Sequence, residues 1–368
     1  MMRIGFDAKR AFFNSRGLGN YSRDMIRIMK ESDNELFLFT PDDHPCVPFD
    51  SGGCNVVLPQ GFVNKHFPAF WRTYGCSSQI ADCNLDVFHG LSNELPFGLN
   101  KTSLRKVITM HDVIFLKHPE WFPFFDRLLF KKKYVESCRR ADYVVAISEA
   151  TKRDVVDLIG VDESKISVVY QRCDPLFSHK CPDDVISSVR AKYNLPSHFI
   201  LTVCAIEERK NHQCVIRALS RMKNRIPYVI VGRDSAYKDV LLDVIASQKV
   251  SDSVFFLHDV PTSDLPAVYQ MADVLAFPSF YEGFGIPLIE AQFSILPVVT
   301  SMGSCFQEVC SNGALYADPS SPDDWAAALD KVLDDSLLRQ SLVSAGASNA
   351  LRYTAENVRN MLMKIYND

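Results

Sequence analysis

The stretch that decides the fold runs from Phe280 to Gln292 and reads Phe-Tyr-Glu-Gly-Phe-Gly-Ile-Pro-Leu-Ile-Glu-Ala-Gln. It follows an apolar run, and it holds two carboxylates, Glu282 and Glu290, on either side of two glycines and a proline. Glycine permits backbone angles that other residues avoid, and proline suits the first turn of a helix, where its missing N–H is not needed. We therefore predict a strand, a glycine loop and a helix that begins near residue 287.

A helix start of this kind aims free backbone amides and the positive end of the helix dipole at whatever lies in front of it. Two carboxylates beside such a helix start suit a ligand that is both phosphorylated and rich in hydroxyl groups. The spacing alone fits a surface acidic pair on an ordinary strand–helix turn equally well. The rest of the chain has to decide between the two interpretations.

The composition is that of a soluble globular protein of two domains: 368 residues, 47% hydrophobic, 23% charged, with a net charge of −4. No uncharged apolar run reaches the roughly 18 residues needed to span a bilayer, and the N-terminus has no apolar core of a secretory signal. We therefore expect a cytoplasmic protein. The net negative charge argues against nucleic-acid binding. The 11 cysteines form no Cys-x-x-Cys pattern, so neither a disulfide framework nor a zinc site is expected.

Short runs of β-forming residues alternate with helical patterns along the chain, which is typical of doubly wound α/β folds. Within the first half we predict strands at 2–7, 35–40, 55–58, 86–89, 106–110, 141–148 and 165–170. Within the second half we predict strands at 198–204, 228–232, 254–257, 274–277 and 297–300. Between these groups, the stretch 175–192 carries two prolines near its start and shows no periodicity.

We therefore expect two Rossmann-like domains, at 1–178 and 179–354, with a ligand cleft between them. The segment of about 355–368 is amphipathic, and one option for it is to pack back on the first domain.

Polar residues follow several strands of the first domain at their C-terminal ends, where open α/β sheets bind ligands. A loop after the first strand holds Gly17 and Gly19 but lacks the third glycine of a dinucleotide fingerprint. His89 and His111 lie at the ends of two further strands. A lone histidine is more often structural than catalytic. His111 is the stronger candidate of the two because it directly follows a strand and precedes Asp112.

Two segments of the first domain combine aromatic and basic residues. The segment 117–140 has seven Lys or Arg against three Asp or Glu, with many aromatic residues, and the segment 62–75 is also crowded with aromatics. A basic helix with an aromatic flank is typical of helices that lie on an anionic membrane surface. The alternative is that the apolar residues face the domain core and the lysines form a solvated face.

Arg209 and Lys210 stand in a polar loop after the first strand of the second domain. Such a pair is usually solvated charge, but at the end of a strand that faces a cleft it suits a diphosphate. Cations for phosphate, a helix start for an anion and carboxylates for hydroxyl groups together indicate a nucleotide sugar.

With these residues in view, the chain resembles a retaining glycosyltransferase of the GT-B fold, of the family 4 (group 1) type that includes many bacterial mannosyltransferases. The resemblance covers nearly the whole chain, and it implies that the domain at 1–178 binds the acceptor and the domain at 179–354 binds the nucleotide-sugar donor. The segment 282–290, Glu-Gly-Phe-Gly-Ile-Pro-Leu-Ile-Glu, matches the E-x7-E motif of that family. Glu207-Glu-Arg-Lys-Asn211 is similar to its donor-phosphate loop, and Gly17-Leu-Gly19 to its N-terminal glycine loop.

The resemblance implies a separate role for each residue of the long motif. Glu282 would contact hydroxyl groups of the donor sugar, and Glu290 would accept hydrogen bonds from the ribose. The backbone amides of Phe284 and Gly285 would help to hold the sugar and the phosphates.

It also implies roles for residues outside that motif. Arg209 and Lys210 would neutralise the diphosphate, the Gly17–Gly19 loop would close over it from the other domain, and His111 would touch the sugar near its reacting face. The departing phosphate would take the proton of the acceptor, so that no protein nucleophile is needed. No Asp-x-Asp occurs in the chain, so we expect neither a metal nor another cofactor.

The activity implied is the transfer of a hexose, with mannose favoured, from a GDP- or UDP-sugar to a glycan or lipid-linked acceptor in surface polysaccharide synthesis. The basic and aromatic segments would allow peripheral contact with the inner membrane face. Two other functions fit parts of the sequence. One is a non-catalytic sensor or scaffold that binds nucleotide sugars. The other is an NAD(P)-dependent oxidoreductase, which the missing third glycine disfavours.

Overall fold

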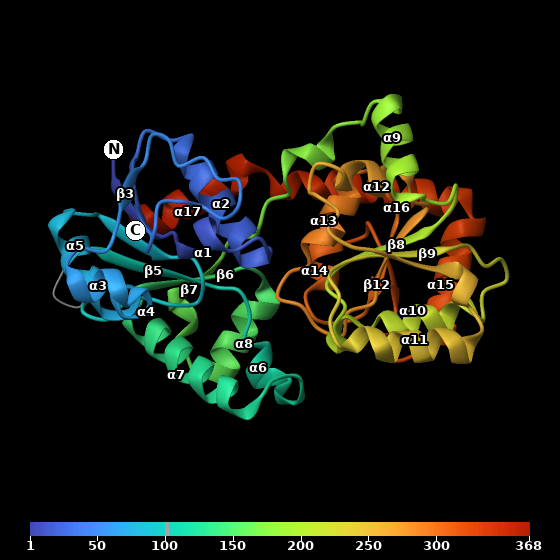
Figure 1. The fold of residues 1–368 in the computed structure, drawn as a ribbon, viewed down its shortest axis with the longest axis horizontal. Helices are drawn as coiled ribbons and strands as arrows, with labels where there is room; N and C mark the ends of the chain where they lie inside the picture. The colour runs from blue at the N-terminus through green and yellow to red at the C-terminus, as the bar shows by residue number, and fades with distance from the viewer. Residues whose placement is uncertain (100–102) are drawn as a thin grey trace. The chain divides into compact units, whose positions relative to one another are not determined.

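The computed structural model describes residues 1–99 and 103–368, which form two units, each a parallel sheet with helices on both faces (Figure 1). The first unit comprises Met1–Arg172 and Ala355–Asp368, and the second comprises Cys173–Thr354. The division falls between Arg172 and Cys173 rather than after residue 178. Both units have the Rossmann-like architecture expected from the sequence.

The sheet of the first unit has seven strands among the described residues, in the order β3-β2-β1-β4-β5-β6-β7. These are β1 (Arg3–Asp7), β2 (Glu35–Phe39), β3 (Asn55–Val57), β4 (Val87–Gly90), β5 (Arg105–Met110), β6 (Tyr143–Ala146) and β7 (Ile166–Val168). The chain builds outward from β1 to β3 and then returns to the other side of β1. The order therefore reverses between β1 and β4, and this reversal is the place where open α/β sheets bind ligands.

Helices cover both faces of this sheet. They are α1 (Lys9–Phe13), α2 (Gly17–Lys30), α3 (Phe62–His66), α4 (Pro68–Phe70), the π-helical turn η1 (Trp71–Gly75), α5 (Cys76–Asp82), α6 (Ile114–Lys117), η3 (Pro119–Trp121), α7 (Phe124–Arg140), α8 (Glu149–Ile159), η4 (Glu163–Lys165) and α17 (Ala355–Asn367). In Figure 1, α1, α2 and α17 lie on one face and α7 and α8 on the other. The sequence sets the ends of α8 locally: Ser148 caps its first turn through the amide of Thr151, and Gly160 ends it with a φ of 79°.

The sheet of the second unit has six strands among the described residues, in the order β10-β9-β8-β11-β12-β13. These are β8 (Ile200–Val203), β9 (Tyr228–Val231), β10 (Val254–Leu257), β11 (Val274–Phe277), β12 (Val298–Ser301) and β13 (Leu315–Ala317). The order reverses here between β8 and β11. Each sheet therefore has one switch point, and both have the same topology around it.

The second unit is also covered on both faces (Figure 1). Its helices are η5 (Pro175–Ser178), α9 (Asp183–Tyr193), η6 (Glu208–Lys210), α10 (His212–Leu219), α11 (Tyr237–Gln248), η7 (Ser251–Ser253), α12 (Leu265–Met271), α13 (Ile286–Phe293), α14 (Phe306–Cys310), α15 (Pro322–Asp334), α16 (Ser336–Ala350) and η8 (Leu351–Tyr353). One layer contains α10, α11 and α15, and the other contains α12, α13 and α16.

The central strands are buried on both faces, which explains why they read as unbroken apolar runs such as Tyr228–Val231. Large side chains fill the space between sheet and helices. Trp325 of α15 is fully buried against the second sheet, and Trp71 of η1 is 1% exposed in the core of the first unit. Burying a smaller apolar side chain, such as leucine or phenylalanine, already stabilises the fold by roughly 1.5–3 kcal/mol.

Three features differ from the sequence-based expectation. The strand β13 was not predicted, because its three residues, Leu-Tyr-Ala, include no β-branched side chain, whereas the equally short β3 and β7 contain valine or isoleucine. The region 175–192, expected to lack regular structure, contains η5 and most of α9. The Gly17–Gly19 segment is not a loop, because α2 begins at Gly17 itself. Among the described residues, no helix is both long enough and apolar enough to cross a membrane.

We predict that the two glycines of this segment differ in their structural importance. A Cβ atom at Gly19 would lie 1.7 Å from the carbonyl oxygen of Asn14, whereas one at Gly17 would meet nothing within 4 Å. Gly19→Ala should therefore lower the free energy of unfolding by about 1–3 kcal/mol, as overpacking does. The matched variant Gly17→Ala should leave it nearly unchanged. Urea unfolding followed by circular dichroism measures both, and equal effects would contradict the assignment.

Candidate functional site

The loops that follow β8 and β11 meet at the switch point of the second unit. The amide of Phe280, in the loop after β11, donates a hydrogen bond to the carbonyl oxygen of Arg209, in the loop after β8, over 2.9 Å. Asn211, with a left-handed φ of 57°, donates from its side-chain amide to the carbonyl oxygens of Pro278 at 3.1 Å and Pro319 at 2.8 Å. Asparagine tolerates this backbone conformation better than most residues do. These long-range contacts join the C-terminal ends of β8, β11 and β13 to one another.

The side chains predicted as the donor site form one ion cluster at this point. The carboxylate of Glu282 is 8% exposed and pairs with the ammonium group of Lys210 through one oxygen and with Nη1 of Arg209, at 3.1 Å, through the other. Arg209 also reaches Glu207, with its Nε 3.1 Å from a carboxylate oxygen. Residues more than 70 positions apart in sequence therefore share one buried charge network.

Electrostatics keep Glu282 ionised. Burial by itself would raise the pKa of its carboxyl group, but the charges of Lys210 and Arg209 overcome that effect and lower the pKa to about 2. Glu282 is thus a carboxylate held by two cations.

Residues that the sequence did not single out hold the backbone of this loop. The hydroxyl group of Ser304 accepts a hydrogen bond from the amide of Glu282 at 3.1 Å and lies 2.9 Å from its carbonyl oxygen. The thiol of Cys305 donates to the carbonyl oxygen of Phe284 at 2.9 Å. Both residues follow β12, the next strand of the sheet. The sequence Ser-Met-Gly-Ser-Cys carries no recognisable motif, so only the fold reveals this support.

The glycine loop and the helix behind it have the predicted geometry. Gly285 precedes α13 with a φ of 98°, which side chains strongly disfavour, and Pro287 lies in the first turn. The ring of Phe284 is 2% exposed and contacts Tyr353 edge to face, with ring centroids 5.7 Å apart. Because that side chain is buried, Phe284 can reach a ligand only through its backbone, as the resemblance implies.

Glu290 lies one turn into α13 and has a partner that the sequence did not indicate. The hydroxyl group of Tyr269, from α12, donates a hydrogen bond of 2.6 Å to a carboxylate oxygen of Glu290. Tyr269 is fully buried, and its ring packs edge to face on Phe177 of η5. Burial raises the pKa of Glu290 to about 7, although the hydrogen bond from Tyr269 opposes the rise. The pKa of Glu282 is therefore lowered and that of Glu290 is raised, although both belong to one motif.

In the first unit, the predicted residue His111 lies in the loop after β5 and is 6% exposed. Its Nε2 lies 2.9 Å from the carbonyl oxygen of Leu91, which can only accept, so the proton of the neutral ring is on Nε2. The amide of His111 donates to the side-chain oxygen of Asn93 at 2.8 Å. Burial lowers the pKa of His111 to about 4. At neutral pH the ring is therefore uncharged, and Nδ1 is its hydrogen-bond acceptor.

The glycine segment and His111 are brought together through Tyr21. Tyr21 stands on α2, which starts at Gly17, and its ring contacts that of His111 edge to face at 4.6 Å. The other histidine, His89, has a different place. It is fully buried inside β4, with Nε2 2.8 Å from Thr109 and Nδ1 2.6 Å from the hydroxyl group of Tyr366 in α17. His89 is thus structural and fixes the C-terminal helix to the first sheet.

The described residues contain one group of three side chains spaced closely enough to hold a metal ion, Asp42, Asp43 and His44. All three are exposed and lie in the first unit, beyond β2. Exposed acidic groups of this kind are common without an ion.

Comparison with known proteins links both units to one class. Residues 187–349 match the family described as glycosyl transferases group 1, and residues 15–175 match Glycosyltransferase Family 4. The chain is 30% identical over 316 residues to the O-antigen chain mannosyltransferase RfbU of Salmonella typhimurium, covering 84% of this chain and 82% of that protein. It is 28% identical over 386 residues to the O-antigen chain mannosyltransferase B of Escherichia coli, covering 99% of both.

Solved structures with the same fold include sucrose-phosphate synthase from Thermosynechococcus elongatus, with a TM-score of 0.81, 19% identity and coverage of 100% of this chain and 98% of that one. HepE from Anabaena in complex with UDP-glucose has a TM-score of 0.74, 17% identity and full coverage of both chains. These likenesses extend over both units.

We predict that Lys210 and Glu282 are energetically coupled. Lys210→Met removes one of two cations from a buried carboxylate and should cost about 3 kcal/mol of stability at pH 7. The pKa of Glu282, about 2, lies below its ordinary value of 4.5, so its contribution to stability is present above pH 4.5 and is lost as the pH falls toward 2. The difference in stability between parent and variant should therefore narrow as the pH falls through that range.

A double-mutant cycle measured by urea unfolding checks this coupling. Lys210→Met and Glu282→Gln should cost less together than the sum of their separate effects. The control pair is Lys210→Met with Asp252→Asn, because Asp252 is exposed on η7, outside this network. Additivity in the first cycle would show that the buried pair is not coupled.

Proposed function

The chain belongs to the group 1 glycosyl transferases, and on that basis we propose that it moves a hexose from a nucleoside diphosphate sugar to a growing surface polysaccharide. Mannose is the sugar we favour, because the two relatives described above are O-antigen chain mannosyltransferases. The acceptor we propose is a glycan or a lipid-linked oligosaccharide.

The observation that carries this proposal is the cluster of Glu282, Arg209 and Lys210 at the switch point of the second sheet. A diphosphate needs cations that are already in place, and a sugar needs a carboxylate that is already ionised. Glu282 orients both cations, while its low pKa leaves it able to accept hydrogen bonds from sugar hydroxyl groups at any physiological pH. Glu290 is proposed to bind the ribose, with Tyr269 fixing the orientation of its carboxylate.

The proposed chemistry is transfer with retention of configuration at the sugar. The bond between C1 of the sugar and the phosphate oxygen breaks, the bond from C1 to the acceptor oxygen forms on the same face, and the acceptor proton passes to the departing phosphate. Arg209 and Lys210 stabilise the negative charge that grows on this phosphate, and one such donor is typically worth about 3 kcal/mol. His111, uncharged with its proton held by Leu91, would accept a hydrogen bond from a sugar hydroxyl group through Nδ1.

We also propose that the reaction needs neither a metal ion nor another cofactor. The two cations beside Glu282 would serve the diphosphate in place of a divalent ion. Activity should then persist when a chelator is present. The competing function is a sensor that binds a nucleotide sugar without turning it over.

Turnover distinguishes the enzyme from the sensor. A thermal-shift panel of UDP-, GDP- and ADP-sugars identifies the donor, and release of the nucleoside diphosphate in the presence of lipid-linked oligosaccharides measures transfer.

We predict that Lys210→Ala lowers kcat roughly a hundredfold and changes the KM for the donor much less, because the charge it meets grows in the transition state. Lys331→Ala, an exposed lysine on α15, is the control. If the parent binds a donor but never releases the nucleoside diphosphate, the sensor function is favoured. If kcat is unchanged in Lys210→Ala, Lys210 does not stabilise the transition state as proposed.

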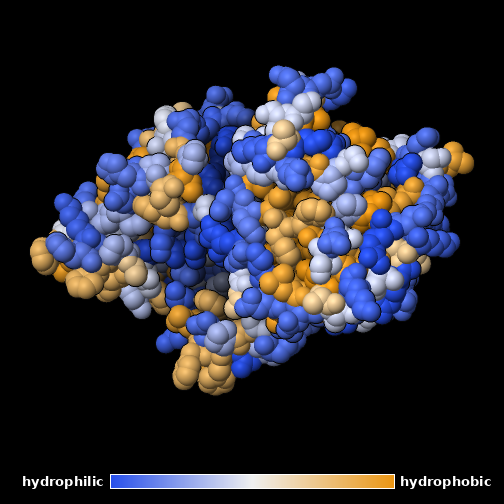
Figure 2. Space-filling model, turned by 45° about the vertical axis from the view of Figure 1, so that its right-hand side comes forward, coloured by the Kyte–Doolittle hydropathy of each residue, from blue (hydrophilic) through white to orange (hydrophobic). Residues whose placement is uncertain are grey.

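We propose further that the first unit contacts an anionic membrane while the protein remains cytoplasmic. Its exposed hydrophobic side chains gather on two elements: Phe62, Phe67, Phe70 and Tyr74 around α3 and α4, and Phe124, Phe125, Leu128 and Leu129 on α7. Figure 2 shows such atoms at the lower margin of the picture, on the part of the first unit that contains α6 and α7 in Figure 1. Phe122 and Phe130 instead pack against the core, which is the alternative considered from the sequence for the apolar residues of this segment.

Exposed lysines beside this apolar surface match the charge of anionic lipids. Lys131 and Lys132 are exposed, whereas Lys133 reaches Glu94. We predict that Lys131→Glu with Lys132→Glu weakens sedimentation with vesicles of phosphatidylglycerol and phosphatidylethanolamine by about thirtyfold, at roughly 1 kcal/mol per lost lysine. Lys249→Glu with Lys331→Glu makes the same charge change on the second unit and should have little effect. Equal effects of the two pairs, or no binding by the parent, would contradict the proposal.

A further inference from the structure

One residue of the second unit combines a strained backbone with a contact to the proposed sugar-binding glutamate. Ser304 lies in the loop between β12 and α14 and has a φ of 50°. This left-handed conformation is uncommon for a residue with a Cβ atom, and it persists only where the surrounding structure enforces it. Strained residues of this kind cluster at binding and catalytic sites. The contacts of Ser304 therefore point to a role beyond packing.

The hydroxyl group of Ser304 binds the backbone of Glu282 through two hydrogen bonds. It accepts one from the amide of Glu282 at 3.1 Å and donates one to the carbonyl oxygen of the same residue at 2.9 Å. A serine hydroxyl group has one donor and two acceptor sites, so a single side chain can satisfy both backbone groups. The peptide groups on either side of Glu282 are thereby fixed relative to the loop after β12.

Glu282 is thus held at both ends. Its carboxylate lies against the cations of Lys210 and Arg209, while its backbone is bound by Ser304. A carboxylate fixed in both position and direction offers its acceptor sites to a ligand in one geometry. Such a group binds a sugar whose hydroxyl groups meet it and disfavours a sugar whose hydroxyl groups point elsewhere.

The next residue, Cys305, fixes a second peptide group of the same motif. Its thiol donates to the carbonyl oxygen of Phe284 at 2.9 Å, and burial raises its pKa, so the thiol keeps its proton at neutral pH. The N–H of Gly285 belongs to the same trans peptide group and points away from that carbonyl oxygen. The amide of Gly285 therefore points away from Cys305. The loop after β12 fixes the motif from one side.

That loop is itself anchored on both sides. The amide of Met302 donates to the carbonyl oxygen of Ala317 in β13 at 2.9 Å. Gly303 has a φ of 88°, and its amide donates to the side chain of Gln307 in α14 at 3.1 Å. Two successive left-handed residues, Gly303 and Ser304, thus turn the chain from β12 toward α14. The strain at Ser304 is imposed by this tight, anchored turn.

We propose that Ser304 is a positioning residue that sets which donor sugar the site accepts. Its hydroxyl group holds Glu282 so that the carboxylate meets the hydroxyl groups of one hexose better than those of its epimers. Among the described residues, this hydroxyl group binds none of Arg209, Lys210 and Glu290, the proposed contacts of the nucleoside diphosphate. Ser304 therefore acts on the sugar and not on the nucleotide. The proposal rests on the proposed transferase function, for which it names the residue that selects the sugar.

Binding of nucleotide sugars by the full chain tests the proposal. Isothermal titration calorimetry measures the affinities for the nucleoside diphosphate alone, for the donor identified by thermal shift, and for an epimer of that donor. The epimer pairs are GDP-mannose with GDP-glucose, and UDP-glucose with UDP-galactose. Ser304→Gly removes the hydroxyl group and relieves the strain. It should weaken donor binding about tenfold, lower the preference for donor over epimer by a similar factor, and change the affinity for the diphosphate less than about twofold.

Ser311→Gly is the matched control. Ser311 has the same φ of 50°, and it is exposed at the end of α14 in the same unit. This substitution should leave all three affinities unchanged, and both glycine variants should unfold within about 4 °C of the parent. Ser304→Ala keeps the strain but lacks the hydroxyl group. It should weaken donor binding as much as Ser304→Gly does, and it serves as the second variant if Ser304→Gly does not fold.

Three results would overturn the proposal. The first is parental donor affinity and preference in Ser304→Gly. The second is equal weakening of donor and diphosphate, which would indicate a general loss of structure. The third is weaker binding in Ser304→Ala alone, which would assign the effect to strain rather than to the hydroxyl group. The transferase function fails separately, if the parent prefers one sugar over its epimer but never releases the nucleoside diphosphate.

Discussion

The buried ion cluster of Glu282, Lys210 and Arg209 is the interaction on which the rest of the second unit depends. A carboxylate removed from water is costly unless cations and hydrogen bonds replace the solvent. Here the two cations come from the loop after β8 and the carboxylate comes from the loop after β11. The backbone contact between Phe280 and Arg209, the side chain of Asn211 and the hydroxyl group of Ser304 hold these loops in register. The cluster therefore forms because β8 and β11 are neighbours in the sheet, and the loops after these two strands fold around it.

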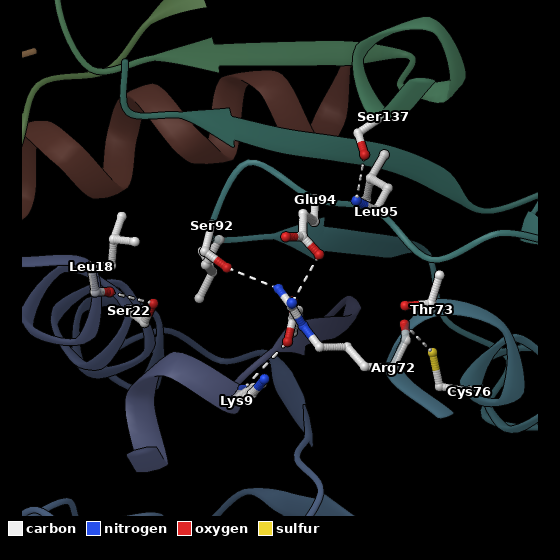
Figure 3. A network of polar contacts seen from close by, with 12 residues as sticks. Lys9, Leu18, Ser22, Arg72, Thr73, Cys76, Ser92, Glu94, Leu95 and Ser137 are labelled. Carbon is white, nitrogen blue, oxygen red and sulfur yellow. Dashed lines mark hydrogen bonds and ion pairs between the residues drawn. The ribbon is translucent and has the colours of Figure 1, made fainter. Parts of the chain in front are cut away.

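The same physical design recurs in the first unit with different residues. Each sheet reverses its strand order once, and each reversal carries a buried network in which arginine contacts carboxylates from separate strands. The networks differ in what they leave free. In the second unit both cations lie against one glutamate, which suits a ligand with a diphosphate and hydroxyl groups. In the first unit Arg72 is occupied by Asp7, Glu94 and Ser92 (Figure 3), and the second oxygen of Glu94 lies 3.4 Å from the ammonium group of Lys133.

Burial also separates chemically similar residues into different roles. Glu282 and Glu290 belong to one short motif, yet the pKa of Glu282 is lowered by adjacent cations and that of Glu290 is raised by burial. His89 and His111 both lie near strand ends. His89 uses both ring nitrogens to fix α17, whereas His111 keeps Nδ1 as an acceptor. These differences arise from neighbours that are distant in sequence.

The sequence by itself determined the architecture, because apolar runs, glycine turns and helical patterns are local signals. Of the thirteen strands that the described residues form, it predicted all but β13, and it grouped Glu282, Arg209 and Lys210 as parts of one site. Only the tertiary structure decided that Gly17 starts a helix, that Tyr269 and Ser304 support the motif, and that Arg72 joins Asp7 to Glu94. Such contacts join residues tens of positions apart, and no local pattern encodes them. They exist because parallel strands bring their carboxyl ends to one edge of the sheet.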